Sequence, residues 1–157
     1  IKGTYGKHPV DTTNHHSCQA VYEGAIAVNQ EGKRYVNESI SYKLHGDACL
    51  KQSYGATYQI LDQTIFESGD NRNPILDFER RLEAGLMIEA QSLEQLAHLI
   101  EVPSDVLAQT VARYNGYVDA GEDLDFGRKN LVHHHGELRR IERAPQPDRM
   151  RLRRVLG

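Results

Sequence analysis

The sequence lacks several features that would each indicate a particular class of protein. Its 157 residues contain no Gly-x-Gly step and only two cysteines. Without Gly-x-Gly there is no G-x-G-x-x-G fingerprint, the turn that lets a backbone approach a dinucleotide pyrophosphate. The two cysteines, Cys18 and Cys49, are too few for a disulfide framework. Two reduced thiols in a cytoplasmic protein are therefore expected, and a single disulfide bridge is the alternative.

Charge and hydropathy exclude two further classes. The formal net charge is −3, so no overall basic field would attract nucleic acid. No apolar run approaches the roughly 20 residues of a membrane span. The first residues, Ile1 to Tyr5, lack the apolar segment of a signal peptide. Because the sequence does not begin with Met, we expect a fragment or a processed product, of a length that fits one domain.

The stretch from Gly24 to Tyr42, which reads GAIAVNQEGKRYVNESISY, is the most informative part of the chain. Two β-rich runs flank a polar turn that contains glycine, a pattern that predicts a hairpin. The two runs are Ala25–Val28 and Tyr35–Val36. Asn37-Glu38-Ser39 then predicts a helix start, because Asn or Ser can cap free backbone N–H groups. Tyr42 falls in the first turn of that helix, where its side chain can face a cleft.

The remainder predicts alternating helices and short strands, and therefore an α+β fold with a small twisted sheet and several helices. Periodicity predicts helices from Ser39 to about Ser53 and from Ile75 to Gly85, and strands at Tyr58–Asp62 and Met87–Ala90. Ser92-Leu93-Glu94-Gln95 matches a capping box that opens a helix. Another helix follows Pro103 and ends at Gly121; its apolar face carries Leu107, Val111, Tyr114 and Val118.

The last segment has a different composition. Between Arg139 and Arg154 there are seven arginines and two prolines, with almost no apolar periodicity. This composition predicts disorder over residues 139–157. An arginine-rich tail that binds anions is the alternative.

Two blocks of the sequence resemble one protein family. The first is Gly24 to Ser39, and the second runs from Thr110 through Arg128 and contains the run DLDFGR. Both are similar to parts of the mobile cap domain of the fumarate reductase/succinate dehydrogenase flavoprotein family, which includes the 3-ketosteroid dehydrogenases. The resemblance implies three parts: residues 1–23 lead in from an FAD domain outside this chain, 24–138 form the cap domain, and 139–157 form the tail.

The resemblance also implies a chemistry. The family transfers a hydride between a substrate carbon and the flavin, while a proton moves on the adjacent carbon beside a carbonyl or carboxylate. The cap supplies orientation, exclusion of water and often the proton-transfer group. Because this chain lacks the Gly-rich turn, we expect FAD in the parent enzyme and none bound to the chain itself. The implied partners are the FAD-binding domain of the parent and a small substrate with a carbonyl or carboxylate.

Tyr42 is the candidate catalytic residue. In fumarate reductases of the family, an arginine four residues after the Asn-Glu pair donates the proton. In 3-ketosteroid dehydrogenases the similar motif has a tyrosine at this position, which serves as the base, and Tyr42 matches it. A phenol is a weak base and needs a neighbouring cation or donor; Lys43 points about 100° away on a helix. The alternative is a tyrosine that only packs its ring on the helix.

His8 is the candidate substrate-binding residue. His8-Pro9 resembles the His-Pro step of the family, whose histidine binds a substrate carboxylate or carbonyl in fumarate reductases; a plain loop histidine is the alternative. Fumarate reductases also carry a glutamate and an arginine of a proton relay just before the hairpin. By simple alignment these fall on Cys18 and Val21, which counts against fumarate reduction proper.

Three other groups of residues carry structural expectations. His133-His134-His135 is expected to be a polar loop and not a metal site, because consecutive histidines point in different directions. Lys33-Arg34 belongs to the family hairpin, and a solvated turn is its alternative. In the second block, we expect Gly127 to allow a bend and Arg128 to make a pairing.

The sequence thus predicts the substrate-capping part of an FAD-dependent oxidoreductase that acts on a C–C bond beside a carbonyl or carboxylate. Tyr42 favours a ketosteroid-type over a fumarate-type substrate. The chain alone is expected to be inactive, and its exposed cap face could drive dimerisation. Two other classes remain open: a stand-alone binding module that uses the cap surface, and an inert fragment that merely folds.

Overall fold

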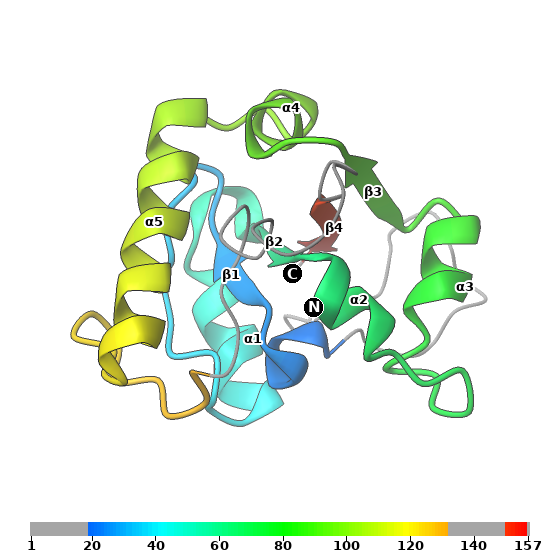
Figure 1. Ribbon diagram of the computed structural model, residues 1–157, viewed down its shortest axis with the longest axis horizontal. Helices are drawn as coiled ribbons and strands as arrows, with labels where there is room; N and C mark the ends of the chain where they lie inside the picture. The colour runs from blue at the N-terminus through cyan, green and yellow to red at the C-terminus, as the bar shows by residue number, and fades with distance from the viewer. Residues whose placement is uncertain (1–18, 132–149, 157) are drawn as a thin grey trace.

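The computed structural model describes residues 19–131 and 150–156, in which helices surround a small antiparallel sheet (Figure 1). The elements in chain order are η1 (Ala20–Glu23), β1 (Ile26–Val28), α1 (Tyr42–Leu50), η2 (Ser53–Gly55), β2 (Ala56–Leu61), α2 (Gln63–Glu67), α3 (Phe78–Glu83), β3 (Met87–Ala90), α4 (Leu93–Leu99), α5 (Ser104–Ala120) and β4 (Met150–Leu156). The predicted α+β class is confirmed. None of the helices in the described ranges has both the length and the apolar character that a membrane crossing requires.

The strand order is β1-β2-β4-β3, and every neighbouring pair is antiparallel. β2 is paired along both edges, with Ile60 opposite Ile26 of β1 and opposite Leu152 of β4. The predicted strand at Tyr58–Asp62 corresponds to β2, and the predicted strand at Met87–Ala90 is β3.

Helices cover both faces of the sheet, because successive residues of a strand point to opposite sides. Ala25, Ala27 and Leu61 pack on one side in a core with residues of η1, α1, α2 and α3. Ile26, Val28, Tyr58 and Ile60 pack on the other side with residues of α4 and α5. Figure 1 shows α4 and α5 at one side of the sheet, away from α2 and α3. Burial on both faces explains why every residue of β2 is buried, although antiparallel sheets often leave one face to water.

Short polar side chains cap the N-termini of α2 and α4. Asp62 accepts a hydrogen bond from the N–H of Ile65 at 2.9 Å and caps α2. Ser92 accepts one from the N–H of Gln95 at 3.1 Å and caps α4, as predicted. The Gln95 side chain accepts from the N–H of Gln91 at 2.6 Å, one residue before the position that a capping box uses.

The predicted hairpin after β1 is only partly formed. Its turn is present: the N–H of Asn29 donates to the carbonyl of Lys33 at 2.9 Å, and Gly32 adopts a φ of +79°. The prediction of a second strand at Tyr35–Val36 is wrong, because the return pairing is a single bridge between Val28 and Arg34. The chain then leaves the sheet because the Arg34 side chain is drawn inward to buried carboxylates.

The prediction of disorder in the tail is wrong for residues 150–156, which form β4 between β2 and β3. Strand pairing uses backbone N–H and C=O groups, so an arginine-rich composition does not prevent it. Without β4, the facing edges of β2 and β3 would be left unpaired in the middle of the sheet. The rest of the predicted tail, 139–149 and Gly157, lies outside the described residues.

Gly69 and Gly116 differ in whether the structure has room for a side chain at their position. A Cβ at Gly69 would lie 2.9 Å from the carbonyl oxygen of Leu76 and 3.0 Å from Cδ2 of Phe78, whereas a Cβ at Gly116 of α5 would meet nothing within 4 Å. We predict that Gly116→Ala raises the free energy of unfolding by about 0.5–1 kcal/mol. Gly69→Ala should lower it by about 1–3 kcal/mol. Urea unfolding of both variants measures the difference, and equal shifts would contradict the packing around Gly69.

Candidate functional site

A buried ion network joins the two blocks of sequence that resembled one family. Arg34 donates from Nε and Nη2 to the two carboxylate oxygens of Glu38, at 2.9 and 2.6 Å. Its Nη1 and Nη2 also donate to the carboxylate of Asp123, at 3.2 and 2.9 Å. The Arg34 side chain is 4% exposed and both carboxylates are 0% exposed. The expectation that Arg34 could be part of a solvated turn is therefore wrong.

A second buried arginine completes the network. Arg128 donates from Nη1 to the carbonyl of Ala25 at 2.9 Å and from Nη2 to the carbonyl of Val21 at 3.0 Å, and its Nη1 lies 3.5 Å from Glu38. The pairing predicted for Arg128 is thus present. The ring of Tyr114 lies 4.9 Å from the Arg34 guanidinium and 5.4 Å from that of Arg128. Two guanidinium groups and two carboxylates balance in charge, which is what burial of charge requires.

The network fixes the ionisation of its members. Burial acts to raise the pKa of Asp123, but the hydrogen bonds from Arg34 and from the backbone N–H of Arg128 outweigh it and hold this pKa at about 2. Burial acts to lower the pKa of Arg34, and its bonds to Glu38 and Asp123 raise it above the ordinary value. Because the Asp123 pKa is depressed, its stabilisation is present above about pH 4 and is lost as the pH falls toward about 2.

The same contacts hold the turn over residues 37–41, which leads into α1. Glu38 accepts from the N–H of Ala27 at 3.2 Å. Asn37 donates from its side-chain amide to the carbonyl of Gly127 at 3.2 Å, and its Oδ1 accepts from the N–H of Ser39 at 2.8 Å. The hydroxyl of Tyr22 donates to the carbonyl of Ile40 at 2.6 Å. The turn is therefore held from β1, from η1 and from the loop after α5.

Tyr42 is the first residue of α1, directly after this turn, so its predicted position in the first helical turn is confirmed. The helix itself begins at Tyr42 and not at the predicted Ser39, because Asn37 and its neighbours form the turn instead. The Tyr42 side chain is 65% exposed. What it does chemically stays a prediction.

Tyr42 belongs to a group of exposed apolar side chains that we call the α1 surface. Its members lie on α1 and η2, with exposed fractions of 65% for Tyr42, 56% for Leu44, 40% for Leu50 and 94% for Tyr54. Tyr54 also has a left-handed backbone, with φ +60°. Tyr42 and Leu44 are two residues apart on α1 and point about 200° apart, so the α1 surface exposes apolar side chains on more than one side of the helix.

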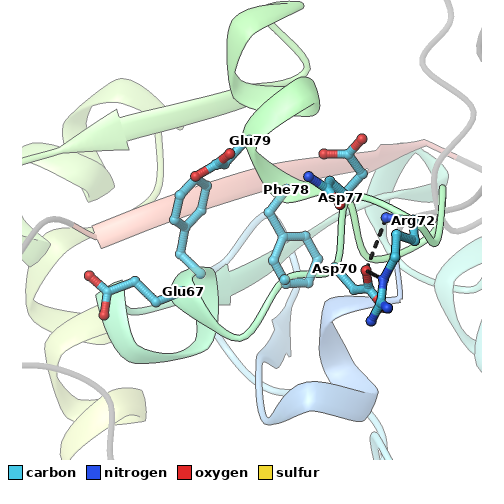
Figure 2. A pocket seen from close by; sticks show the side chains of 9 residues that line it. Glu67, Asp70, Arg72, Asp77, Phe78 and Glu79 are labelled. Carbon is cyan, nitrogen blue, oxygen red and sulfur yellow. Dashed lines mark hydrogen bonds and ion pairs between the residues drawn. The ribbon is translucent and has the colours of Figure 1, made fainter.

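Two hollows among the described residues lie away from the α1 surface. One of about 320 Å³ lies by α2 and α3 (Figure 2), where Asp70 pairs with Arg72 at 3.0 Å. Figure 2 shows the carboxylate of Glu67 well apart from those of Asp77 and Glu79, so these groups do not converge on one ion. Within residues 19–131 and 150–156, no group of three or more His, Cys, Asp or Glu side chains could hold a metal.

Another hollow, of about 480 Å³, lies beside the ion network. Its lining includes Arg34 and Tyr114 of the network, together with Arg113 and Asp125. Arg113 donates to both carboxylate oxygens of Asp125, at 2.7 and 2.8 Å, at the surface. Neither of these two hollows is lined by Tyr42.

The residues that the structure describes do not fit FAD on their own. Binding the pyrophosphate of FAD needs a Gly-rich turn between a strand and a helix of a parallel β-α-β unit. The strands of this sheet pair only antiparallel, and the sequence has no Gly-x-Gly step. Any flavin site therefore depends on residues outside the described ones.

Several predicted site residues are not placed by the structure. His8, Cys18 and His133-His134-His135 lie outside the described residues. Val21 is buried in η1, where its backbone N–H donates to Oε1 of Gln59 at 3.2 Å, so its side chain has no polar group for a proton relay.

Arg34, Glu38 and Asp123 are the important residues that sequence reasoning missed. The available signal was the spacing of Arg34 and Glu38, which allows an ion pair, together with the acidic and basic residues of the second block.

The chain is similar in sequence to three curated oxidoreductases. It is 38% identical over 104 residues to an NADH:acrylate oxidoreductase of Vibrio harveyi, a match that covers 66% of this chain and 10% of that protein. It is 36% identical over 108 residues to a fumarate reductase (cytochrome) of Shewanella frigidimarina, a match that covers 69% of this chain and 18% of that protein. It is 32% identical over 123 residues to a 3-oxosteroid 1-dehydrogenase of Mycolicibacterium smegmatis, a match that covers 67% of this chain and 21% of that protein. No family model matches the sequence.

The fold is similar to two solved structures. The open conformation of a flavocytochrome c3 fumarate reductase matches with a TM-score of 0.69 and 26% identity, over 87% of this chain and 22% of that one. The solution structure of a fumarate reductase flavoprotein subunit from Lactobacillus plantarum matches with a TM-score of 0.64 and 25% identity, over 88% and 86%. The sequence matches cover between 10% and 21% of the length of these three curated relatives.

The ion network predicts unequal effects for two arginines that each pair with an aspartate. Arg34→Met would leave buried carboxylates without their guanidinium and should lower the free energy of unfolding by about 3–5 kcal/mol. Arg113→Met removes an exposed pair, since the Arg113 side chain is 65% exposed, and should cost less than about 1 kcal/mol. Urea unfolding of both variants measures this, and similar costs would contradict the proposed weight of the buried network.

Proposed function

The chain belongs to the flavoprotein family of fumarate reductases and 3-ketosteroid dehydrogenases, and we propose that it is the substrate-capping part of an FAD-dependent oxidoreductase. The parent enzyme acts on a C–C bond beside a carbonyl or carboxylate. FAD, held by residues outside this chain, supplies the hydride chemistry. The chain contributes orientation, exclusion of water and a proton-transfer group.

One observation carries the proposal: Tyr42 is exposed at the start of a helix whose preceding turn is held in place. The turn over 37–41 is fixed by the buried Glu38 and by the amide of Asn37. A proton-transfer group needs this kind of support, because a displacement of ~1 Å can cost ~10²-fold in rate. The 65% exposure of Tyr42 leaves its hydroxyl free to meet a substrate bound outside the chain.

The identity of Tyr42 favours a ketosteroid-type substrate. A phenol in this position suits removal of a proton beside a carbonyl, with the phenolate stabilised by groups of the assembled site. The apolar side chain of Val21 supports the same choice, since it provides no relay toward Tyr42 for reduction of fumarate. We include His8 in the proposal as the residue that binds the substrate carbonyl or carboxylate.

The α1 surface is the proposed contact with the FAD-binding part of the parent. Leu44, Leu50 and Tyr54 lie exposed on the elements that follow Tyr42. A surface of this kind is protected from water when the two parts close on a substrate. In the isolated chain the same surface is available for self-association. We include a cytoplasmic location in the proposal; among the described residues, Cys49 is a buried cysteine outside any disulfide.

A stand-alone binding module is the second candidate, and one comparison favours it. The Lactobacillus plantarum structure is a chain of similar extent that was solved in solution, since the match covers 88% of this chain and 86% of that one. A domain of this type can therefore fold without the remainder of a flavoenzyme. In that case the α1 surface would bind its partner without catalysis.

We predict that the purified chain folds but does not retain FAD, because its described residues do not form a pyrophosphate site. After incubation with excess FAD and dialysis, the protein should show no visible flavin absorbance, while circular dichroism shows helix and strand. Stoichiometric flavin in the dialysed protein would contradict this part of the proposal.

We predict that Tyr42→Phe in the parent polypeptide, with its FAD-binding part, lowers turnover by roughly 10²–10⁴. The substitution keeps the ring and removes only the hydroxyl, so thermal stability should barely change. Tyr117→Phe is the matched control: it removes a hydroxyl from a buried tyrosine of α5 and should leave turnover unchanged. If Tyr42→Phe also retains turnover, Tyr42 is not the proton-transfer residue.

A further inference from the structure

A fully buried histidine lies one helical turn from Tyr42. His45 is 0% exposed, and together with Gly46 and Cys49 it forms the buried side of α1. Side chains three residues apart lie on the same side of a helix, so His45 and Tyr42 are neighbours along α1. One of the two is inside the protein and the other is 65% exposed.

The first turn of α1 closes without a side-chain cap. Ser41 is the N-cap residue but makes no side-chain capping hydrogen bond. The N–H of His45 donates to the carbonyl of Ser41 at 3.0 Å, which closes the turn that contains Tyr42. Because the His45 imidazole is buried beneath this turn, its packing ties the backbone of Tyr42 to the core.

The immediate surroundings of His45 suit a neutral imidazole. The ring of Tyr35 meets it edge to face, with 6.0 Å between centroids. The Tyr35 hydroxyl donates to Oγ1 of Thr57 at 3.0 Å, and the Sγ of Cys49 lies 3.3 Å from the same oxygen. Burial is the first cause that raises the pKa of both Tyr35 and Cys49, so both groups stay uncharged near neutral pH.

Charged groups among the described residues lie near His45 and along α1. The nearby cation is Arg128, which opposes a second positive charge. Glu38 is the carboxylate of this region, and Arg34 and Arg128 already engage it. On α1 itself, Lys43 and Asp47 are exposed.

The elements that pack against α1 include η2 and β2, and Cys49 of α1 also lies in the core with apolar residues of η1, α2 and α3. From η2 comes the exposed phenol of Tyr54, and from β2 the uncharged Thr57. Burial first, and then Arg128, lower the pKa of His45 to about 4, against the opposing effect of its backbone hydrogen bond.

We propose that His45 is a positioning residue for Tyr42 and makes the start of α1 sensitive to pH. While it is neutral, the imidazole holds the first turn of α1 against the sheet, and its protonation releases that turn. The importance of Tyr42 as the group being positioned rests on the proposed function, whereas the anchoring by His45 does not.

The size of the effect follows from linkage. A released turn exposes His45 to water, where it titrates near its ordinary pKa of 6.5, while the packed residue titrates at about 4. The released form therefore takes up the proton more readily, so the anchoring is complete above about pH 6.5 and is lost as the pH falls toward about 4. Between about pH 7.5 and about pH 5, release of the turn should become roughly 30-fold more favourable.

Amide hydrogen exchange on the full chain, followed by NMR, tests the proposal. The protection factors of the His45 and Gly46 amides should fall roughly 30-fold between about pH 7.5 and about pH 5. The amide of Val111 in α5 should keep its protection, because it reports the core on the other face of the sheet. Unchanged protection at Gly46, or an equal loss at Val111, would overturn the proposal.

A matched pair of variants identifies the histidine. His45→Gln keeps a polar, neutral side chain and should abolish the pH dependence at Gly46. His98→Gln removes an exposed histidine of α4 and should retain it. A pH dependence that survives His45→Gln would assign it to another group and overturn the proposal. If His45→Gln does not fold, the comparison of Gly46 with Val111 in the unaltered chain decides.

The outcomes separate this inference from the proposed function. Loss of protection at Gly46 with normal turnover of Tyr42→Phe would keep the anchoring and reject the role of Tyr42. Constant protection at Gly46 with a strong effect of Tyr42→Phe would reject the anchoring and keep the role.

Discussion

The pairing of Arg34 with Glu38 and Asp123 is the constraint on which the remainder of the structure depends. It brings together residues 89 positions apart in sequence and excludes water from all three side chains. A buried charge without its partner would cost several kcal/mol, so the segments that carry Arg34 and Asp123 cannot separate without that cost. Arg128 extends the effect by binding the carbonyls of Val21 and Ala25, which fixes the backbone at the start of β1.

This arrangement gives the family resemblance a physical meaning. The two blocks that resemble the family are the two sides of the network, with Arg34 and Glu38 on one side and Asp123 and Arg128 on the other. Their first task is structural, because they hold the turn that ends at Tyr42. Relatives named as acting on acrylate, fumarate and oxosteroids can share such a frame while the residue after the turn differs. In the proposed function, the substrate class is decided by residues such as Tyr42, which lies directly after the turn that the network holds.

Local signals in the sequence predicted the parts of the fold that local forces determine. Ser92 caps α4, Gly121 ends α5, and β3 has the predicted bounds Met87–Ala90, because each depends on a cap, a left-handed residue or a short apolar run. Long-range pairing was not accessible in the same way. The strand at Met150–Leu156 forms because β2 and β3 both offer unpaired edges, which no feature of its own arginine-rich sequence indicates.

In the candidate site, too, local sequence predicted some features, whereas others depend on long-range contacts. Tyr42 could be placed in a first helical turn from the preceding Asn37-Glu38-Ser39 alone. The burial of Arg34 could not be predicted, because a lysine–arginine step in a polar turn normally lies in water. Arg34 is drawn inward by Glu38 together with the distant Asp123. The importance of His45 was hidden for a related reason, since its burial depends on Tyr35 and β2 and not on its neighbours in sequence.

A double-mutant cycle between Arg34 and Asp123 tests most directly whether the two blocks act as one unit. The free energies of unfolding of Arg34→Met, Asp123→Asn and the double variant would be measured in urea. The structure predicts strong coupling, with the double variant less destabilised than the sum of the two single variants by about 1–3 kcal/mol. Additivity within about 0.5 kcal/mol would show that the two blocks are independent and would contradict the account.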